Sequence, residues 1–94
     1  MLYVGIGSFT LLLYEGVSLK EKRMVIRSLM QKISSRYNVS IAEVGEQDKW
    51  QLSEIGFSCV GNERVHVEKM MQEIIRFAEA DGRGEIINIQ TEIV

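Results

Sequence analysis

The sequence predicts an α+β fold in one domain, residues 1–94, with the element order βαββαβ. Two observations predict this order. Apolar residues alternate with other residues along four segments, as in strands, and recur every three to four positions along two others, as in amphipathic helices. Each helical segment follows a strand segment, and the chain has no proline to interrupt it. This is the split βαβ or ferredoxin-like topology, a four-stranded antiparallel sheet with both helices on one face.

The first strand is expected over residues 2–14, since Phe9 and Leu11 lie on one side of an alternating pattern. Gly5 and Gly7 would weaken the interior of a strand. They therefore mark either a bulge or a place where a helix packs closely against the sheet.

The first helix is expected from Leu19 to about Tyr37. Ser18 precedes it as a suitable N-cap, and Glu21 stands three residues later, as in a capping box. Asn38 suits the exit of the helix because asparagine tolerates the left-handed conformation. One face would be buried, and it carries Ile26, Leu29, Met30, Ile33 and Tyr37.

The middle of the chain predicts a hairpin. Residues 39–44 are expected to form a short strand and residues 45–49 a polar, charged loop. A longer strand follows over residues 50–60, with Phe57 and Cys59 on its apolar face.

The second helix is expected over residues 63–80, with Asn62 as its N-cap, and residues 81–84 end it. Its buried stripe would consist of Val67, Met70, Met71, Ile74, Phe77 and Ala78. The last strand is expected over residues 85–94. One face of that strand would carry Ile87, Ile89 and Ile93, and the other Asn88, Gln90 and Glu92.

Charge and cysteine content exclude several classes of protein. The formal net charge is −2, so any affinity for nucleic acid or a membrane surface must come from a local patch. Cys59 is the only cysteine, which excludes an intramolecular disulfide or a thiolate zinc site and indicates a buried structural thiol. The longest apolar run, residues 11–14, is too short to span a bilayer, and no secretory signal is expected because residues 1–5 lack a basic segment. A cytoplasmic protein without a membrane partner is therefore expected.

The first helix carries the strongest candidate for a binding surface. Six of the eleven lysine and arginine residues lie in it with Glu21 as its only acid, while 12 of the 13 carboxylates lie elsewhere. Lys20, Arg23 and Arg27 fall within about 60° of one another, beside the buried face. With Lys22, they are the candidate residues for binding RNA or another anion, whereas DNA is not expected. A basic face that is merely solvated is the competing interpretation.

The sequence offers two further candidates. The free N–H groups of the first helix could hold a phosphate, unless Ser18 and Glu21 already satisfy them. In the hairpin, Asp48, Trp50 and Gln51 are candidate partner-binding residues, because an exposed aromatic beside a loop can anchor a partner. Alternatively, the Trp50 ring covers the end of the core and Asp48 shapes the loop.

The sequence shows no catalytic constellation. His66, the only histidine, is expected on the solvent face of the second helix. Carboxylates lack the spacing of metal ligands. The run Gly5-Ile6-Gly7 lacks the third glycine of a dinucleotide-binding loop. No cofactor, metal site or catalytic residue is therefore predicted.

The open face of the sheet is expected to lack the aromatic residues on which RNA-binding domains of this topology stack bases. It would carry mainly small and polar side chains, namely Ser8, Thr10, Leu12, Gly56, Ser58, Asn88 and Gln90. An apolar end formed by Val4, Ile6 and Leu12 could pair with a second copy of the chain. A homodimer is therefore one expected assembly.

Three segments resemble the YlxP-like family of small bacterial proteins of unknown function: residues 18–23 (Ser-Leu-Lys-Glu-Lys-Arg), residues 37–44 and residues 47–51 (Gln-Asp-Lys-Trp-Gln). The resemblance covers nearly the whole chain and implies a ferredoxin-like fold. It also implies a role beside the ribosome or RNA, because genes of this family often sit among those for translation initiation and ribosome maturation, next to ribosome-binding factor A. It implies no catalytic residues. The positions that it marks are Ser18, Lys20, Lys22, Arg23, Asn38, Ser40, Glu43, Asp48, Trp50 and Gln51.

Three functions compete on this basis. The leading expectation is a non-enzymatic accessory protein that contacts ribosomal RNA or a ribosome-assembly factor through the first helix. A structural or ligand-sensing homodimer is the second. An acylphosphatase-like hydrolase shares the size and topology, but residues 15–18 lack a glycine-rich phosphate loop and Arg23 lies inside the helix.

Overall fold

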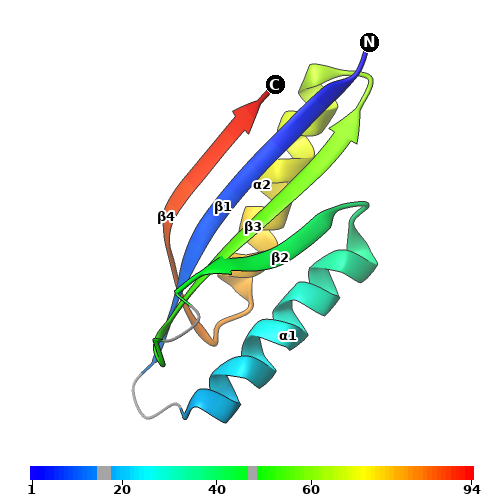
Figure 1. Ribbon diagram of the computed structural model, residues 1–94. Helices are drawn as coiled ribbons and strands as arrows, with labels where there is room; N and C mark the ends of the chain where they lie inside the picture. Colours follow the sequence, from blue (N-terminus) through cyan, green and yellow to red (C-terminus); the bar gives the residue numbers. More distant parts are fainter. Residues whose placement is uncertain (15–17, 47–48) are drawn as a thin grey trace.

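The computed structural model describes residues 1–14, 18–46 and 49–94 and has the expected order of elements (Figure 1). The elements are β1 (Tyr3–Leu13), α1 (Leu19–Arg36), β2 (Ser40–Gly45), β3 (Leu52–Gly61), α2 (Arg64–Ala80) and β4 (Gly84–Ile93). The predicted fold class is confirmed, because every helix and strand expected from periodicity is present close to its expected bounds.

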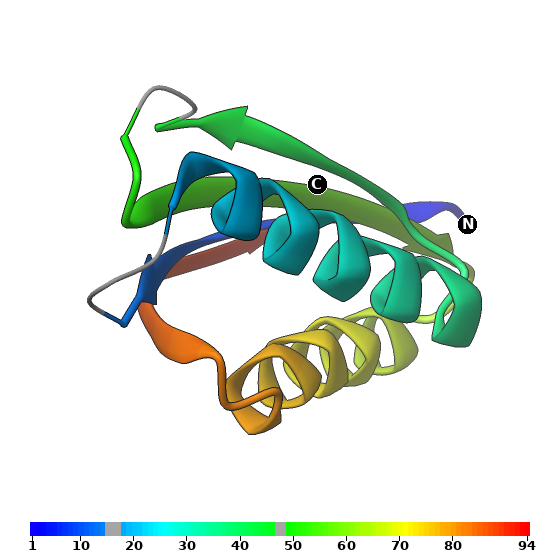
Figure 2. The same ribbon diagram turned by 90° about the horizontal axis from the view of Figure 1, so that it is seen from below.

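The four strands form one antiparallel sheet in the spatial order β2-β3-β1-β4. Both helices cover the same face of the sheet, and the other face is open (Figure 2). The register of β1 and β3 places Leu12 opposite Leu52. At the other end of β1, Val4 N–H donates to Val94 O at 3.0 Å and Val94 N–H donates to Val4 O at 2.9 Å. The two ends of the chain therefore lie side by side (Figure 1).

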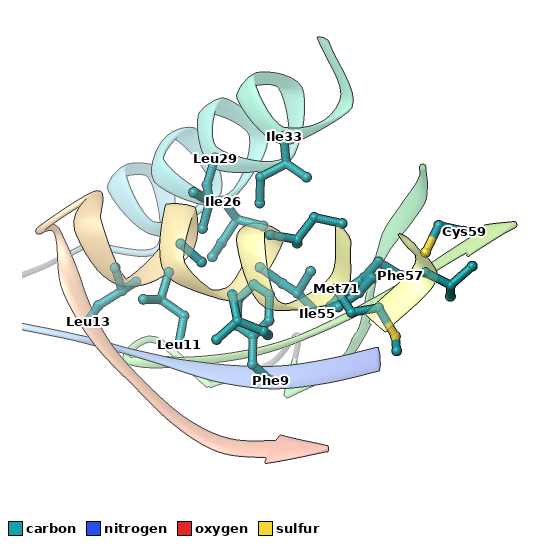
Figure 3. Packing of buried hydrophobic residues seen from close by; sticks show 14 residues of the cluster. Phe9, Leu11, Leu13, Ile26, Leu29, Ile33, Ile55, Phe57, Cys59 and Met71 are labelled. Carbon is teal, nitrogen blue, oxygen red and sulfur yellow. The ribbon is translucent and has the colours of Figure 1, made fainter. Parts of the chain in front are cut away.

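The hydrophobic core lies between the sheet and the two helices (Figure 3). Its buried members are Phe9, Leu11, Leu13, Ile26, Leu29, Ile33, Ile55, Phe57, Cys59, Val67, Met71, Ile74, Ile75 and Ala78. Gly5 lets α2 approach the sheet, because a Cβ there would lie 2.7 Å from Cγ1 of Val67. A Cβ at Gly7 would overlap the ring of Phe57. Close packing, and not a bulge, accounts for both glycines.

A bulge does occur in β4, between Ile87 and Gln90, where the register with β1 shifts and Asn88 has a φ of 53°. The extra residue in a bulge reverses the alternation of side chains along a strand. Ile86 therefore joins Ile93 against the core. The prediction of one apolar face shared by Ile87, Ile89 and Ile93 is wrong for this reason.

The start of α1 agrees with its prediction. Ser18 Oγ accepts a hydrogen bond from Glu21 N–H at 3.1 Å, and Glu21 Oε1 accepts one from Ser18 N–H at 3.3 Å. These two bonds complete the capping box. The structure thus favours a plain capped helix over an anion pocket at this point.

Two other predicted helix ends are wrong. α1 ends in an extended conformation at Tyr37, with a φ of −124°, and Asn38 has no positive φ, because the chain passes directly into β2. The N-cap of α2 is Glu63 and not Asn62, and its side chain makes no capping hydrogen bond. Packing of the apolar stripe of α2, rather than a cap, stabilises the start of that helix.

The open face of the sheet has no aromatic residue of the strands, as expected. Tyr3, Phe9 and Phe57 all pack against the core on the helix-covered side. The single apolar end expected on the open face is not formed, because Ile6 and Leu12 lie toward opposite ends of β1.

Candidate functional site

The basic face of α1 is exposed over its first half. Lys20, Arg23 and Arg27 are all exposed, and the Met24 side chain beside them is 61% exposed. Among the ion pairs of the described residues, none involves these three cations. Their charges are therefore open to an anionic partner from solvent, as the helical spacing predicted.

Lys22 does not belong to this exposed face, which corrects its prediction as an RNA-binding residue. Its exposed fraction is 2%. Its Nζ donates to Glu46 O at 2.8 Å and to Lys49 O at 2.5 Å, and lies 3.8 Å from Glu43 Oε2. Lys22 thus joins the first turns of α1 to the segment between β2 and β3.

The sequence contained a signal for this placement. The four buried residues of α1 are Lys22, Ile26, Leu29 and Ile33. Lys22 therefore stands on the same apolar stripe as the core residues, at i, i+4, i+7 and i+11. A lysine on that stripe has to find oxygen partners inside the protein, because an unpartnered buried charge is costly.

A glutamate and a serine complete the surroundings of Lys22. Glu43 of β2 lies opposite Ile55 on the core side of the sheet. Its Oε2 accepts a hydrogen bond of 2.5 Å from Oγ of Ser53, a fully buried residue of β3. The sequence marked Glu43 only through the family resemblance. Its role in the structure is to partner buried groups.

The hairpin candidates are only partly described. Asp48 lies outside the described residues. Trp50 is 62% exposed, so the interpretation that its ring covers the end of the core is wrong. Gln51 is exposed as well, and its carbonyl accepts a hydrogen bond from Leu13 N–H at 2.7 Å. Tyr14, which no sequence pattern singled out, is 60% exposed.

These features gather at one end of the molecule. Figures 1 and 2 show that the start of α1, the end of β1 and the start of β3 lie together, away from the chain ends. The structure therefore brings two separately predicted candidates, the basic helix face and Trp50, into one region. We call this region the basic end and define it by Lys20, Arg23, Arg27, Tyr14 and Trp50.

The second half of α1 is engaged within the molecule. Lys32 Nζ lies 3.9 Å from Asp81 Oδ1, and the Arg36 guanidinium lies 5.4 Å from the centre of the Phe77 ring. These contacts turn both cations toward α2. The candidate surface is accordingly limited to the first half of the helix.

A small polar cluster ties the turn before β4 to α1. Arg83 donates to Asp81 from Nε at 2.6 Å and from Nη2 at 2.9 Å, and Nη2 also donates to Ser28 Oγ at 3.3 Å. The hydrogen bonds from Arg83 hold the pKa of the Asp81 carboxyl below its ordinary value. This cluster is structural, since it satisfies its own members.

The remaining candidates for chemistry are unpromising. Cys59 is 3% exposed, and burial raises the pKa of its thiol, which disfavours the reactive thiolate. His66 is exposed on α2, 3.9 Å from Glu63 Oε2. Across the described ranges, no three histidine, cysteine, aspartate or glutamate residues are placed to hold a metal ion. Residues 15–17, where a hydrolase would need its anion cradle, lie outside the described residues.

A groove of about 650 Å³ runs between α2 and β4. Its lining combines apolar side chains such as Ile75 with charges of both signs, including Arg64, Arg76 and Glu79. Neither helix of the described chain is long and apolar enough to cross a membrane.

Fold and site together define a small α+β domain with an antiparallel sheet open on one face and a basic end formed by its first helix. The chain belongs to the family described as "Protein of unknown function (DUF503)", whose model matches residues 4–91. It is 35% identical over 77 residues to the uncharacterised protein YlxP of Bacillus subtilis (strain 168), a match that covers 82% of this chain and 84% of that protein. The resemblance to the YlxP-like family is therefore confirmed.

One solved structure with a similar backbone is SnoaB, a cofactor-independent oxygenase from Streptomyces nogalater. The match covers 99% of this chain and 90% of the SnoaB chain, with a TM-score of 0.47 and 10% sequence identity. A likeness this distant says nothing about the activity of the present protein.

Proposed function

We propose that this protein is a non-enzymatic, cytoplasmic accessory factor that binds RNA at the ribosome or during its assembly through the basic end. One observation carries the proposal: Lys20, Arg23 and Arg27 stand exposed, with no carboxylate partner among the described residues. Phosphate contacts by such cations supply most of the sequence-independent affinity of proteins for nucleic acids.

The distribution of charge supports this proposal. The whole chain has a formal net charge of −2, yet 12 of its 13 carboxylates lie outside the segment from Lys20 to Arg36. An acidic remainder would repel a polyanion from most of the surface. A long anionic partner would therefore meet the molecule at the basic end and in few other places.

The ribosomal setting rests on the family. The resemblance to the YlxP-like family implies this setting, because genes of that family often sit among those for translation initiation and ribosome maturation. The chain belongs to that family. The partner proposed on this ground is ribosomal RNA or a ribosome-assembly factor.

Co-sedimentation with purified small ribosomal subunits tests the proposal. The triple variant Lys20→Glu, Arg23→Glu and Arg27→Glu should lose co-sedimentation at moderate salt. A matched triple variant on α2, Arg64→Glu, Lys69→Glu and Arg76→Glu, changes net charge equally and should keep it. In a plot of log K against log salt concentration, the native protein should have a slope steeper by about 2 than the first variant, because the variant lacks three phosphate contacts. Equal binding by both triple variants would contradict the proposal.

A homodimer is the second candidate, favoured by apolar side chains on the open face. Ile6 is 47%, Val44 57% and Val60 53% exposed. Pairing of two such faces would bury this surface. Equilibrium sedimentation of the native protein and of Ile6→Lys, with and without added metabolites, tests it. A native protein that is monomeric at every concentration and indifferent to ligands excludes this candidate.

A further inference from the structure

Two large aromatic side chains stand exposed at the basic end. Trp50 is 62% and Tyr14 60% exposed, whereas the aromatic residues within the strands pack against the core. Burying an aromatic side chain is among the larger favourable contributions to folding. Aromatic rings left at the surface, at the same end as cations with no carboxylate partner in the described ranges, therefore call for a partner that presents both flat rings and negative charge.

The sheet register brings these two residues to the same place. Leu12 pairs with Leu52, and the ladder continues with the bond from Leu13 N–H to Gln51 O. In an antiparallel pair the next residues in line are Tyr14 and Trp50. Both residues therefore directly follow the last bonded pair, at the same end of β1 and β3.

Lys22 ties the backbone before Trp50 to the basic helix. Its Nζ donates to the carbonyl of Lys49, the peptide group that leads into Trp50, at 2.5 Å. Lys20 and Arg23 flank Lys22 in the sequence of α1 and are exposed. A buried ammonium with several oxygen partners fixes the backbone before Trp50 relative to those two cations.

A hollow of about 290 Å³ lies beside Tyr14, lined also by Leu12, Gln51 and Glu85. Leucine carbons provide an apolar floor. The amide of Gln51 and the carboxylate of Glu85 are groups that can hydrogen-bond the edge of a base. The site thus offers a flat contact, an apolar surface and polar edge groups within one small space.

Building on the proposed function, we propose that the basic end binds unpaired RNA, with Tyr14 and Trp50 stacking on its bases and Lys20, Arg23 and Arg27 contacting its phosphates. Lys22 is a positioning residue that sets Trp50 beside the cations. A paired helix keeps its bases inside, so the aromatic residues cannot reach them. Single-stranded RNA is therefore the preferred form, with little dependence on sequence.

The test measures binding of a fluorescently labelled single-stranded RNA and of the duplex formed with its complement. Trp50→Ala should weaken binding of the single strand about 5- to 150-fold, the range for loss of one stacked base. The same change should leave duplex binding unaltered, and Trp50→Phe, which keeps a ring, should restore most of the affinity. Val65→Ala, at a position of α2 that is 68% exposed and belongs to neither candidate surface, is the control and should change neither.

Lys22 is tested through the only tryptophan of the chain. Binding of single-stranded RNA should quench Trp50 fluorescence in the native protein. Lys22→Met should weaken both the quenching and the affinity while leaving the salt slope unchanged, because the phosphate contacts remain. Circular dichroism establishes that the variant is folded, and Lys22→Arg, which keeps a charged donor, should recover part of the quenching.

The outcomes separate the two proposals. Suppose that the charge-reversal triple variant loses RNA binding while Trp50→Ala binds single strand and duplex like the native protein. Stacking on Trp50 is then refuted, whereas RNA binding by the basic face is supported. If the native protein binds neither RNA form, both proposals fall. Equal weakening of single strand and duplex by Trp50→Ala would also refute stacking.

Discussion

Lys22 is the residue on which the architecture of the basic end depends. Its stem lies on the buried stripe of α1, and its ammonium reaches oxygen atoms that lie 24 and 27 residues further along the chain. An ammonium moved from water into the protein interior loses several kcal/mol of solvation, which oxygen partners with good geometry offset. These hydrogen bonds join the backbone of residues 46 and 49 directly to α1.

Replacing Lys22 with methionine should destabilise the protein. The apolar stem is retained, but the carbonyl groups of Glu46 and Lys49 lose a charged donor. We expect the free energy of unfolding to fall by about 2–4 kcal/mol. Urea denaturation followed by circular dichroism measures it, and Lys20→Met, at an exposed position of the same helix, should stay within about 0.5 kcal/mol of the native value. Equal stability of the two variants would contradict the role of Lys22.

Asp81 should make the free energy of unfolding depend on pH. Its pKa is lowered in the folded protein by hydrogen bonds from Arg83, so its carboxylate contributes stability above the unfolded pKa of about 3.9. This contribution is lost as the pH falls below about 4 and through the folded pKa. Asp81→Asn should therefore be less stable than the native protein at pH 7. The difference in free energy of unfolding between the two proteins should be smaller at pH 3.

The matched control for Asp81 is Ser28→Ala. It removes the Oγ that accepts from Arg83, but no titrating group. Its effect in urea denaturation should be the same at pH 7 and pH 3. If the Asp81→Asn difference were also independent of pH, the pKa of Asp81 would not be lowered in the folded protein.

At the scale of elements, the sequence predicted what depends on local pattern. Six elements, the fold class and the capping box at Ser18 all follow from periodicity and from residue types within a few positions. The bulge at Asn88 did not follow, because a bulge depends on the fit of β4 against β1. The helix exit at Asn38 was wrong for a similar reason, since the pairing of β2 with β3 decides how the chain leaves α1.

The contact of β1 with β3 at Gly7 gives a prediction about the sheet. A Cβ there would overlap the Phe57 ring, so Gly7→Ala should lower the free energy of unfolding by about 1–3 kcal/mol. Gly56→Ala is the control on the open face, where the nearest atom, Cγ1 of Val44, would lie 3.2 Å from the new Cβ and can move into solvent. Thermal unfolding compares them. Combining Gly7→Ala with Phe57→Leu should recover part of the loss, and its failure to do so would place the strain elsewhere.

For the whole molecule, charge is divided between α1, which carries six of the eleven lysine and arginine residues, and the rest of the chain, which carries 12 of the 13 carboxylates. The sequence predicted the excess of cations on α1, because composition along one helix is visible without the fold. It could not predict that Trp50 and Tyr14 would join those cations, since that depends on the pairing of strands far apart in the chain. The sequence analysis also placed Lys22 on the exposed face, because the carbonyl oxygens that accept from its ammonium belong to the hairpin.

Retention on immobilised heparin should reveal this division of charge. The native protein has a net charge of −2 and should nevertheless be retained at low salt, because its basic end faces the polyanion. The variant Lys20→Glu, Arg23→Glu and Arg27→Glu should elute earlier than the α2 variant Arg64→Glu, Lys69→Glu and Arg76→Glu. Both variants carry the same net charge, so a shared elution position would show that total charge, and not its placement, governs retention.

The hydrogen bonds between Val4 and Val94 have a practical consequence for these experiments. They place both ends of the chain at the pole opposite the basic end (Figure 1). A purification tag or a surface-attachment group on either end therefore leaves the RNA-binding candidates facing away from the support. The same proximity makes the chain suited to circular permutation: a short linker can join the old ends, and an opening at an exposed turn would provide new ones.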